Sequence, residues 1–166
     1  LILIKIGRGV GAGIVLNGSL FYGDGASAGE IGQVVVAEEN GRLLTLEDIA
    51  STPAILQQAE TVAQGPVEWE ALLHAKAYDT VFERVGHFIG VAVAHLIGGF
   101  NIHHISITGR IAQRGDPFLE TIRQTAMRYA LPRTAAKTEI AFSTLGNDIV
   151  LLGCSALVLK HELGIV

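Results

Sequence analysis

Cysteine and charged residues are scarce in this chain of 166 residues. Cys154 is the only cysteine, which excludes a disulfide framework and is typical of a protein in the reducing cytoplasm. Charged residues make up 17% of the chain, whereas globular domains contain about 25%. We therefore expect apolar surface that is covered by another lobe or by a second copy of the chain, and a homodimer is our prediction.

Basic clusters and uninterrupted apolar runs of membrane length are also missing. The formal net charge is −4, and Arg123, Arg128 and Arg133 form no dense basic stripe, so this segment is not expected to bind nucleic acid by itself. The opening LILIKI is too short for the apolar part of a signal peptide, and the longer apolar runs contain polar interruptions. We expect a cytoplasmic protein without membrane contact.

The length favours a single domain over residues 1–166. A chain of this size buries roughly 70% of the surface that it exposes when unfolded, which is enough for one core. We find no repeat, low-complexity tract or internal linker, and the first residues already follow a strand pattern. We therefore expect one domain that has been excised from a longer protein.

Glycine, by contrast, is abundant, and nine of the 20 glycines lie within residues 5–32. Glycine lets the backbone turn at positive φ and approach a ligand with no Cβ in the way. The flanking segments are rich in β-branched residues, and Asn17-Gly18 is a signal of a type I′ hairpin. The pattern predicts a strand, a glycine turn, a hairpin and then a loop that presents Glu30, which is the layout of a small-molecule site.

Two phosphate-binding motifs are excluded for this glycine run. Gly7, Gly9 and Ala12 satisfy a loose dinucleotide pattern, but that motif must open a helix. The following residues 14–18 are β-branched and end in a turn, so they leave no room for one. A Walker A loop is excluded because no Gly-Lys-Ser/Thr follows.

The rest of the chain predicts alternating strands and helices. Strands are expected at about 1–6, 12–17, 19–22, 33–37, 104–107 and 139–142, and helices at about 46–64, 68–76, 80–100, 116–130 and 148–163. This order implies an α/β fold, a mixed sheet with helices on its faces. The helix over 80–100 is apolar on nearly all sides and should be buried, with Gly86 and Gly90 allowing close helix packing.

Several segments together resemble one protein family over nearly the whole chain. They are the glycine run at 7–15 with Gly18, Leu20 and Gly23, the AGEIG segment at 28–32, Leu46, Glu47, Ala50 and Ser51, the TGR turn within 107–112, and the segment 152–156. They resemble the C-terminal lobe of the ROK family, which groups sugar-responsive transcriptional repressors, uncharacterised reading frames and sugar kinases. The resemblance implies the ribonuclease-H-like lobe of the actin-like ATPase fold.

The resemblance also implies a set of site residues. Glu30, Gln33 and Glu47 match the family positions that contact sugar hydroxyls, a task that suits carboxylates because each can accept hydrogen bonds from two hydroxyls. On the phosphate or nucleotide side, if that function is retained, the resemblance assigns four glycines: Gly7, Gly9, Gly11 and Gly109. No catalytic residue is assigned within this chain.

Glu47 also has a local reason for its position. Thr45 and Asp48 have the spacing of a capping box, with Leu44 and Ile49 placed for a hydrophobic staple. Glu47 then lies in the first helical turn, where the helix dipole favours a negative charge. Its alternative role is that of a simple N-terminal helix acid.

The chain departs from the family pattern at a zinc site. The family carries a C-x-C-G-x-x-G-C loop and the histidine of a GEIGH segment, whereas residues 38–46 contain no cysteine and Gln33 replaces the histidine. Zinc requires thiolate, imidazole or carboxylate ligands in a tetrahedral array. We therefore expect no bound metal, and we expect residues 38–44 to be mobile because no zinc clamps them.

Two further departures concern kinase activity. Arg8 stands where the family's kinases carry a small hydroxyl residue in a phosphate-binding turn, and a guanidinium there crowds the place of a γ-phosphate. The catalytic aspartate of those kinases belongs to an N-terminal lobe, and no aspartate of this chain lies in a matching motif. Phosphoryl transfer needs a base and metal-held phosphates, so this chain alone is not expected to be a kinase.

Three functions stay open at this point. The first is the sugar-effector-binding and dimerisation lobe of a ROK transcriptional regulator, which contacts DNA only through a missing N-terminal domain and needs no cofactor. The second is the C-terminal lobe of a glucokinase-like sugar kinase that uses Mg-ATP. The third is a degenerate lobe that only dimerises, since the family's histidine and cysteines are lost.

The absence of a zinc site is directly testable. Metal analysis of protein purified without added zinc should find far less than one zinc ion per chain, because the thiolate and imidazole ligands are missing. A stoichiometric zinc content would contradict this prediction.

Overall fold

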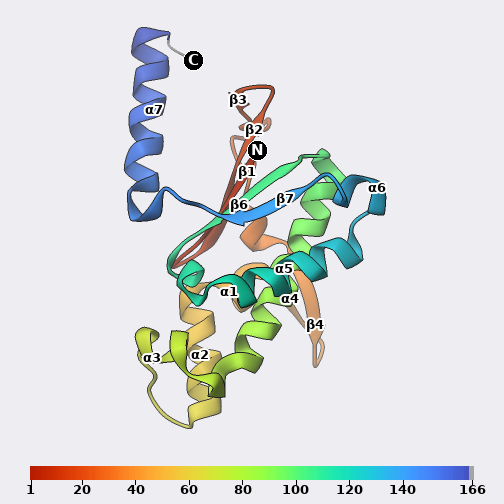
Figure 1. The fold of residues 1–166 in the computed structure, drawn as a ribbon, viewed down its shortest axis with the longest axis vertical. Helices are drawn as coiled ribbons and strands as arrows, with labels where there is room; N and C mark the ends of the chain where they lie inside the picture. Colours follow the sequence, from red (N-terminus) through yellow and green to blue (C-terminus); the bar gives the residue numbers. More distant parts are fainter. Residues whose placement is uncertain (165–166) are drawn as a thin grey trace.

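The computed structural model describes residues 1–164 and contains a mixed β-sheet with helices packed around it (Figure 1). The strands are β1 (Ile2–Ile6), β2 (Val10–Leu16), β3 (Ser19–Leu20), β4 (Val35–Glu39), β5 (Arg42–Thr45), β6 (His104–Thr108) and β7 (Glu139–Phe142). The main sheet has the order β3-β2-β1-β6-β7, and β4 and β5 form a separate pair. In the main sheet β1 is antiparallel to β2 and parallel to β6, which confirms the predicted mixed sheet.

Seven α-helices and four short 3₁₀ segments connect the strands in the described part of the chain. The helices are α1 (Leu46–Ala50), α2 (Thr52–Ala63), α3 (Trp69–His74), α4 (Asp79–Phe100), α5 (Asp116–Tyr129), α6 (Pro132–Ala135) and α7 (Ile149–Leu163). The 3₁₀ segments are η1 (Ile31–Gln33), η2 (Lys76–Tyr78), η3 (Arg110–Arg114) and η4 (Gly146–Asp148). Each predicted helical range contains helix, although the range 46–64 contains two helices, α1 and α2, and the short α6 was not predicted.

Strand β1 forms the centre of the core because alternate residues point to its buried face. Ile2, Ile4 and Ile6 are almost completely buried, and Ile4 pairs across the parallel ladder with Ile107 of β6. Burying such a side chain contributes about 1.5–3 kcal/mol. The same ladder brings the ends of β1 and β6 together, with Lys5 opposite Thr108. The turns that follow these two strands therefore lie at one edge of the sheet.

Helices α4 and α5 pack closely against each other, as the glycines of α4 predict (Figure 1). A Cβ at Gly90 would lie 2.5 Å from Cβ of Thr125 and 2.8 Å from the carbonyl oxygen of Ile122. A Cβ at Gly86 would lie 3.0 Å from Cγ2 of Thr121. The two glycines thus remove the side-chain volume that would hold the helices apart.

The apolar character of α4 is explained by its place in the core. The segment Lys76–Phe100 is long and apolar enough to cross a membrane by length and composition alone, but 61% of its most apolar stretch is buried inside the domain. A core helix passes the same test. Because its apolar residues are mostly buried in the core, α4 leaves little apolar surface free for a partner.

The hairpin of β4 and β5 differs from the loop that we expected at residues 38–44. Its turn is Asn40-Gly41, and both residues have positive φ, 51° and 76°. These values suit a type I′ turn, which matches the twist of two paired strands. The Asn-Gly signal of a hairpin predicted the turn at Asn17-Gly18. The hairpin at Asn40-Gly41 was not predicted, because its second strand, β5, has only four residues, Arg42–Thr45. Mobility of this segment stays a prediction.

The single helix expected at about 46–64 is divided at Ser51. Ser51 has extended backbone angles, φ −66° and ψ 152°, and its hydroxyl accepts a hydrogen bond from the Ala54 N–H at 3.4 Å. Pro53 follows in the first turn of α2, where its missing N–H costs nothing. The break turns the chain between α1 and α2, so Ser51 is an N-cap rather than a helix interior residue.

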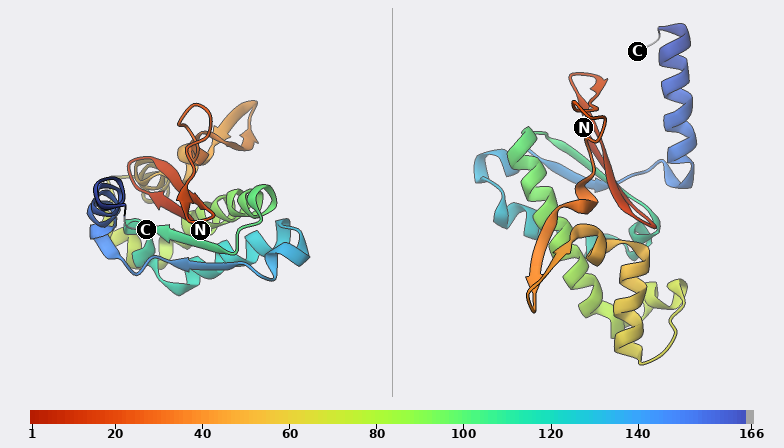
Figure 2. Two further views of the ribbon diagram at one scale, coloured as in Figure 1. Left: turned by 90° about the horizontal axis from the view of Figure 1, so that it is seen from above. Right: turned by 180° about the vertical axis from the view of Figure 1, so that it is seen from behind.

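Helix α7 stands apart from the rest of the fold in all three views (Figures 1 and 2). Ile149 at its start is its only buried residue among those described, whereas Leu151, Val158 and Leu163 are at least 60% exposed. A helix that is apolar all round is stable in water only when something covers it. Among the described residues, α7 therefore carries more exposed large apolar side chains than α4 does.

We predict that Gly90→Ala destabilises the fold through the contact of α4 with α5. The added Cβ meets backbone and side-chain atoms below van der Waals distance, and overpacking of this kind costs about 1–3 kcal/mol. Chemical denaturation with a matched control, Gly98→Ala, tests this. A Cβ at Gly98 meets nothing within 4 Å, so helix propensity alone should stabilise that variant by up to about 1 kcal/mol. Equal shifts in both variants would contradict the packing argument.

Candidate functional site

The turn that joins β1 to β2 lies between two cavities. Gly7 lines a cavity of about 640 Å³, and the next residue, Arg8, lines another of about 490 Å³. We call the first the Gly109 cavity and the second the Glu47 cavity, after one lining residue of each. They share no lining residue in the described part of the chain. The turn therefore separates two spaces that a ligand could occupy.

The backbone of this turn is fixed by residues of α1 and α2. The Val10 N–H donates a hydrogen bond to Oε2 of Glu47 at 2.8 Å. The Thr52 N–H donates another to the carbonyl oxygen of Gly7 at 2.7 Å. Both bonds connect residues more than 30 positions apart in the sequence. They therefore fix the turn between β1 and β2 relative to α1 and α2.

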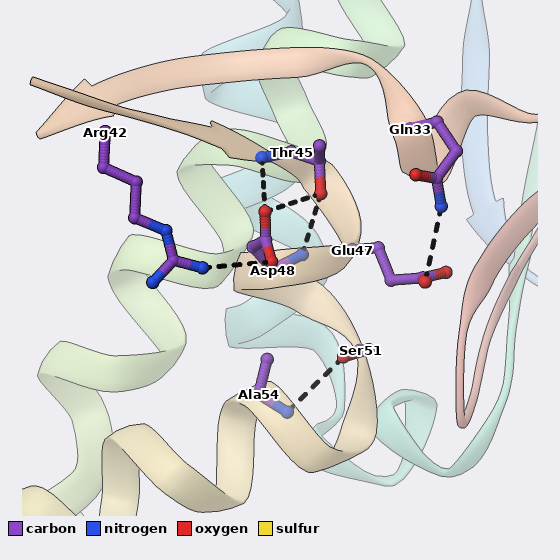
Figure 3. Close-up of polar contacts among 7 residues, drawn as sticks. All are labelled: Gln33, Arg42, Thr45, Glu47, Asp48, Ser51 and Ala54. Atoms are coloured by element: carbon purple, nitrogen blue, oxygen red, sulfur yellow. Dashed lines mark hydrogen bonds and ion pairs between the residues drawn. The ribbon is translucent and has the colours of Figure 1, made fainter.

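Glu47 lines the Glu47 cavity, and its side chain extends from α1 toward Gln33 (Figure 3). It is half-buried in the first turn of α1, where the helix dipole stabilises a carboxylate. Besides the bond from Val10, its Oε1 accepts a long hydrogen bond of 3.4 Å from Nε2 of Gln33. The structure thus brings together Gln33 and Glu47, two of the three predicted sugar-contacting residues, and directs both toward the cavity.

The glycines Gly7, Gly9 and Gly11, which the family resemblance assigns to the nucleotide side, have different surroundings in the structure. A Cβ at Gly9 would lie 2.7 Å from Oε2 of Glu47, so only glycine lets this carboxylate reach the backbone of the turn. Gly11 lies in β2 opposite Lys5 and close to the carbonyl oxygen of Gly29. Gly7 alone of these three lines the Gly109 cavity. Their assignment to a nucleotide side stays a prediction.

Glu30, the third predicted sugar contact, is exposed and does not line the Glu47 cavity. It precedes η1, and its carbonyl oxygen accepts a hydrogen bond from the Gln33 N–H at 3.1 Å. Its backbone therefore helps to place Gln33, while its carboxylate has no hydrogen-bond partner within residues 1–164. A role for this side chain in ligand binding stays a prediction.

The capping box predicted for Thr45 and Asp48 is present and fixes the start of α1 (Figure 3). The Thr45 hydroxyl accepts a hydrogen bond from the Asp48 N–H at 3.2 Å, and the Thr45 N–H donates to Oδ2 of Asp48 at 2.9 Å. These hydrogen bonds from the Thr45 backbone and hydroxyl, with a smaller contribution from Arg42, hold the pKa of Asp48 below its ordinary value. The box orients the helix turn that carries Glu47.

The Gly109 cavity lies at the ends of β1 and β6. Gly109 has a φ of +122°, and a Cβ there would lie 1.9 Å from the carbonyl oxygen of Ile6, so the turn after β6 requires glycine. Lys5 and Arg110 contribute positive charge, and none of the described lining residues is acidic. The basic lining favours an anionic ligand, but the described lining residues supply no carboxylate for magnesium.

Sequence reasoning missed three polar residues of the Glu47 cavity. Arg42, Ser51 and Gln57 line it together with the predicted pair. Arg42 comes from the β4–β5 hairpin and Ser51 from the helix break, and neither element was predicted. Gln57 follows one and a half turns into α2, and its position depends on the same break.

Metal-binding residues do not gather in the described part of the molecule. Within residues 1–164 no three His, Cys, Asp or Glu side chains lie close enough to hold a metal ion. Whether the protein contains zinc is decided by the metal analysis proposed above.

We predict that Asp48→Asn destabilises the protein most at neutral pH. A lowered pKa means that the ionised carboxylate stabilises the folded state above the ordinary carboxyl pKa, and that this contribution is lost as the pH falls through the lowered value. The loss in Asp48→Asn should be about 0.3–1 kcal/mol at pH 7 and should shrink below about pH 4.

Urea denaturation between pH 3 and pH 7 measures this difference. Asp24→Asn is the matched control, because Asp24 is an exposed acid in the loop that follows β3. If the Asp48→Asn variant lost the same free energy of unfolding at every pH in this range, the result would contradict the assigned role of the carboxylate.

Both sugar kinases and transcriptional regulators are similar in sequence to this chain. A glucokinase from Halalkalibacterium halodurans is 32% identical over 98% of this chain and 57% of its own length. A xylose repressor from Caldicellulosiruptor bescii is 28% identical over 98% of this chain and 47% of its own length. The chain spans about half the length of these relatives.

Solved structures share the fold. The crystal structure of a ROK family transcriptional regulator, a homologue of the E. coli MLC protein, superposes with a TM-score of 0.76 at 27% identity, over 85% of this chain and 41% of that chain. Solved ROK sugar kinases have the same actin-like ATPase fold. The ROK family model matches residues 1–161. The chain therefore belongs to the ROK family.

Proposed function

We propose that this chain is the sugar-effector-binding lobe of a cytoplasmic transcriptional regulator. The observation that carries the proposal is the pair of Glu47 and Gln33 at a cavity of about 490 Å³. The cavity is large enough for a monosaccharide, and both side chains offer groups that hydrogen-bond to hydroxyls. Each oxygen of Glu47 has lone pairs left after its bond to Val10 or Gln33, so two sugar hydroxyls can donate to it.

Features of the same cavity favour binding over phosphoryl transfer. Asp48 is the other carboxylate that lines it, but its Oδ2 is held by Thr45 and its pKa is lowered, which makes it a weak general base. Arg8 lines this cavity, and its neighbour Gly7 lines the Gly109 cavity, so a bulky cation stands in the turn next to both spaces. Xylose repressors among the relatives agree with a regulator.

A sugar kinase is the second candidate, and the Gly109 cavity favours it. The cavity is basic, contains the glycine turn after β6 and is large enough for a nucleotide. The similarity to a glucokinase agrees with this candidate. Such a kinase would use Mg-ATP and would take its catalytic base from another part of the full-length protein. Gly7 and Gly109 would then border the nucleotide.

Partners follow from the same proposal. A regulator would contact DNA through another domain, since this chain carries no dense basic stripe and has a net charge of −4. A homodimer stays our prediction, and the exposed apolar residues of α7 are the surface that most needs a partner. Another lobe of the same protein would cover α7 equally well. A lobe that only dimerises would leave the Glu47 cavity without a ligand.

We predict that a sugar stabilises the full-length protein through Glu47. Thermal-shift assays against glucose, xylose and N-acetylglucosamine, with and without Mg-ATP, should show a stabilising sugar and no effect of Mg-ATP. A ligand at a hundredfold over its dissociation constant stabilises by about 2.7 kcal/mol, which the assay detects. Glu47→Gln should weaken binding roughly 10- to 100-fold, since hydrogen bonds to a charged group contribute about 1.5–3 kcal/mol.

Glu38→Gln is the matched control, because Glu38 is an exposed acid of β4 outside the cavity. Sugar binding that is unchanged in Glu47→Gln would contradict the proposed site. Sugar-dependent consumption of ATP would establish the kinase instead, and the absence of any ligand would favour a lobe that only dimerises.

A further inference from the structure

Arg110 borders the Gly109 cavity, but its guanidinium is held on α3. Arg110 is the first residue of η3, directly after the glycine turn that follows β6. Its Cζ lies 5.4 Å from the centre of the Trp69 ring, and its Nη2 forms an ion pair with Oε1 of Glu70. One of the two cations of the cavity, Arg110 rather than Lys5, is therefore engaged by a helix whose own residues do not line the cavity.

The ion pair of Arg110 with Glu70 is exposed, so it can be exchanged. The two side chains are 51% and 73% exposed. Exposed pairs of this kind contribute little to stability, and salt screens them. A guanidinium binds two oxygens of a phosphate group at once, and such charge-assisted bonds are stronger. Arg110 can therefore leave Glu70 for an anionic group in the cavity.

Arg114, at the other end of η3, makes a contact with α3 that is not exchangeable in this way. Its side chain is only 17% exposed. It donates a hydrogen bond to the carbonyl oxygen of Leu73, forms an ion pair with Asp79 and lies over the Phe82 ring at 4.6 Å. These contacts hold the end of α3 on η3. The guanidinium of Arg110 can therefore move without releasing the helix as a whole.

Trp69 is placed to report such a movement. Its side chain is 3% exposed, and its indole Nε1 has no hydrogen-bond partner among the described residues. The cation over its ring is the guanidinium of Arg110, which the ring attracts through its electron-rich face. Indole fluorescence responds to a nearby charge, and Trp69 is the only tryptophan in this sequence. Departure of Arg110 should therefore change the emission of Trp69.

We propose that Glu70 is a built-in competitor for the anion that the Gly109 cavity binds, with Arg110 as the cation that both share. Without an anion, the guanidinium lies over Trp69 and pairs with Glu70. With a phosphate-bearing ligand in the cavity, the guanidinium transfers to the phosphate oxygens and Glu70 is released to solvent. Glu70 thus sets how tightly the cavity binds its ligand without lining it. This inference does not depend on a sugar in the Glu47 cavity.

The exchange requires a phosphate group rather than a carboxylate. A carboxylate ligand would offer Arg110 the same group that Glu70 already provides. A phosphate monoester carries about −1.5 to −2 charges near pH 7 and has three acceptor oxygens, so it can outcompete Glu70. Lys5 supplies a second positive charge to the same cavity.

Binding of small anions to the full-length protein tests the inference. The probes are inorganic phosphate, pyrophosphate and ATP, each with and without magnesium, and acetate is the carboxylate control. Calorimetry measures the affinity, and tryptophan fluorescence follows Trp69. We expect at least one phosphate probe to bind and to change the fluorescence, and we expect acetate to do neither. The change should disappear in Trp69→Phe, which assigns it to this residue.

Variants test the competition itself. Glu70→Gln should bind the same probe about two- to fivefold more tightly in low salt, and the gain should shrink as the salt concentration rises. Arg110→Gln should weaken binding and abolish the fluorescence change, and adding Glu70→Gln to it should then have no effect. Glu68→Gln is the matched control, because Glu68 is an exposed acid directly before α3 that forms no ion pair within residues 1–164.

Four results would overturn the inference. Unchanged affinity in Glu70→Gln would show that Glu70 does not compete, and an equal gain in Glu68→Gln would show only a general effect of charge. Binding without a change at Trp69 would show that the guanidinium stays over the ring. A protein that binds none of the phosphate probes would have no ligand for Arg110. Sugar binding through Glu47 is measured separately, so the proposed function would stand or fall independently of these results.

Discussion

The hydrogen bond from the Val10 N–H to Glu47 is the contact on which the candidate site depends. It connects the turn at the edge of the sheet to the first turn of α1 across 2.8 Å. Glycine at position 9 is necessary for it, since a Cβ there would lie 2.7 Å from the same oxygen. The capping box of Thr45 and Asp48 orients the helix from the other side. Glu47 is thus held in place by backbone geometry before any ligand arrives.

Two cavities meet at the turn that this contact holds in place. Consecutive residues of the turn, Gly7 and Arg8, line different cavities. Arg8 brings a positive charge to this turn, and the cavity that it lines also contains Gln33 and Glu47, the side chains proposed to bind sugar hydroxyls.

Most of the fold could be predicted from the sequence because its signals are strong and local. The alternating isoleucines of β1, the glycine turn and the apolar helix α4 each follow from periodicity and residue type. The site was only partly predictable, since Gln33 and Glu47 were found through family resemblance. Arg42 and Ser51 were missed because their positions depend on a short hairpin and a helix break. The place of Gly9 against Glu47 is a tertiary contact between residues 38 positions apart, which no local pattern encodes.

Helix α7 carries exposed apolar residues and only one buried residue among those described. Its apolar residues were read from the sequence as a helix, but nothing in the sequence indicates what covers them. The role of the Glu47 cavity is tested most directly by a crystal structure of the full-length protein with a bound sugar. We expect ligand hydroxyls within hydrogen-bond distance of Glu47 and Gln33. A ligand that occupies another place and leaves Glu47 in contact with Val10 and Gln33 alone would contradict the account.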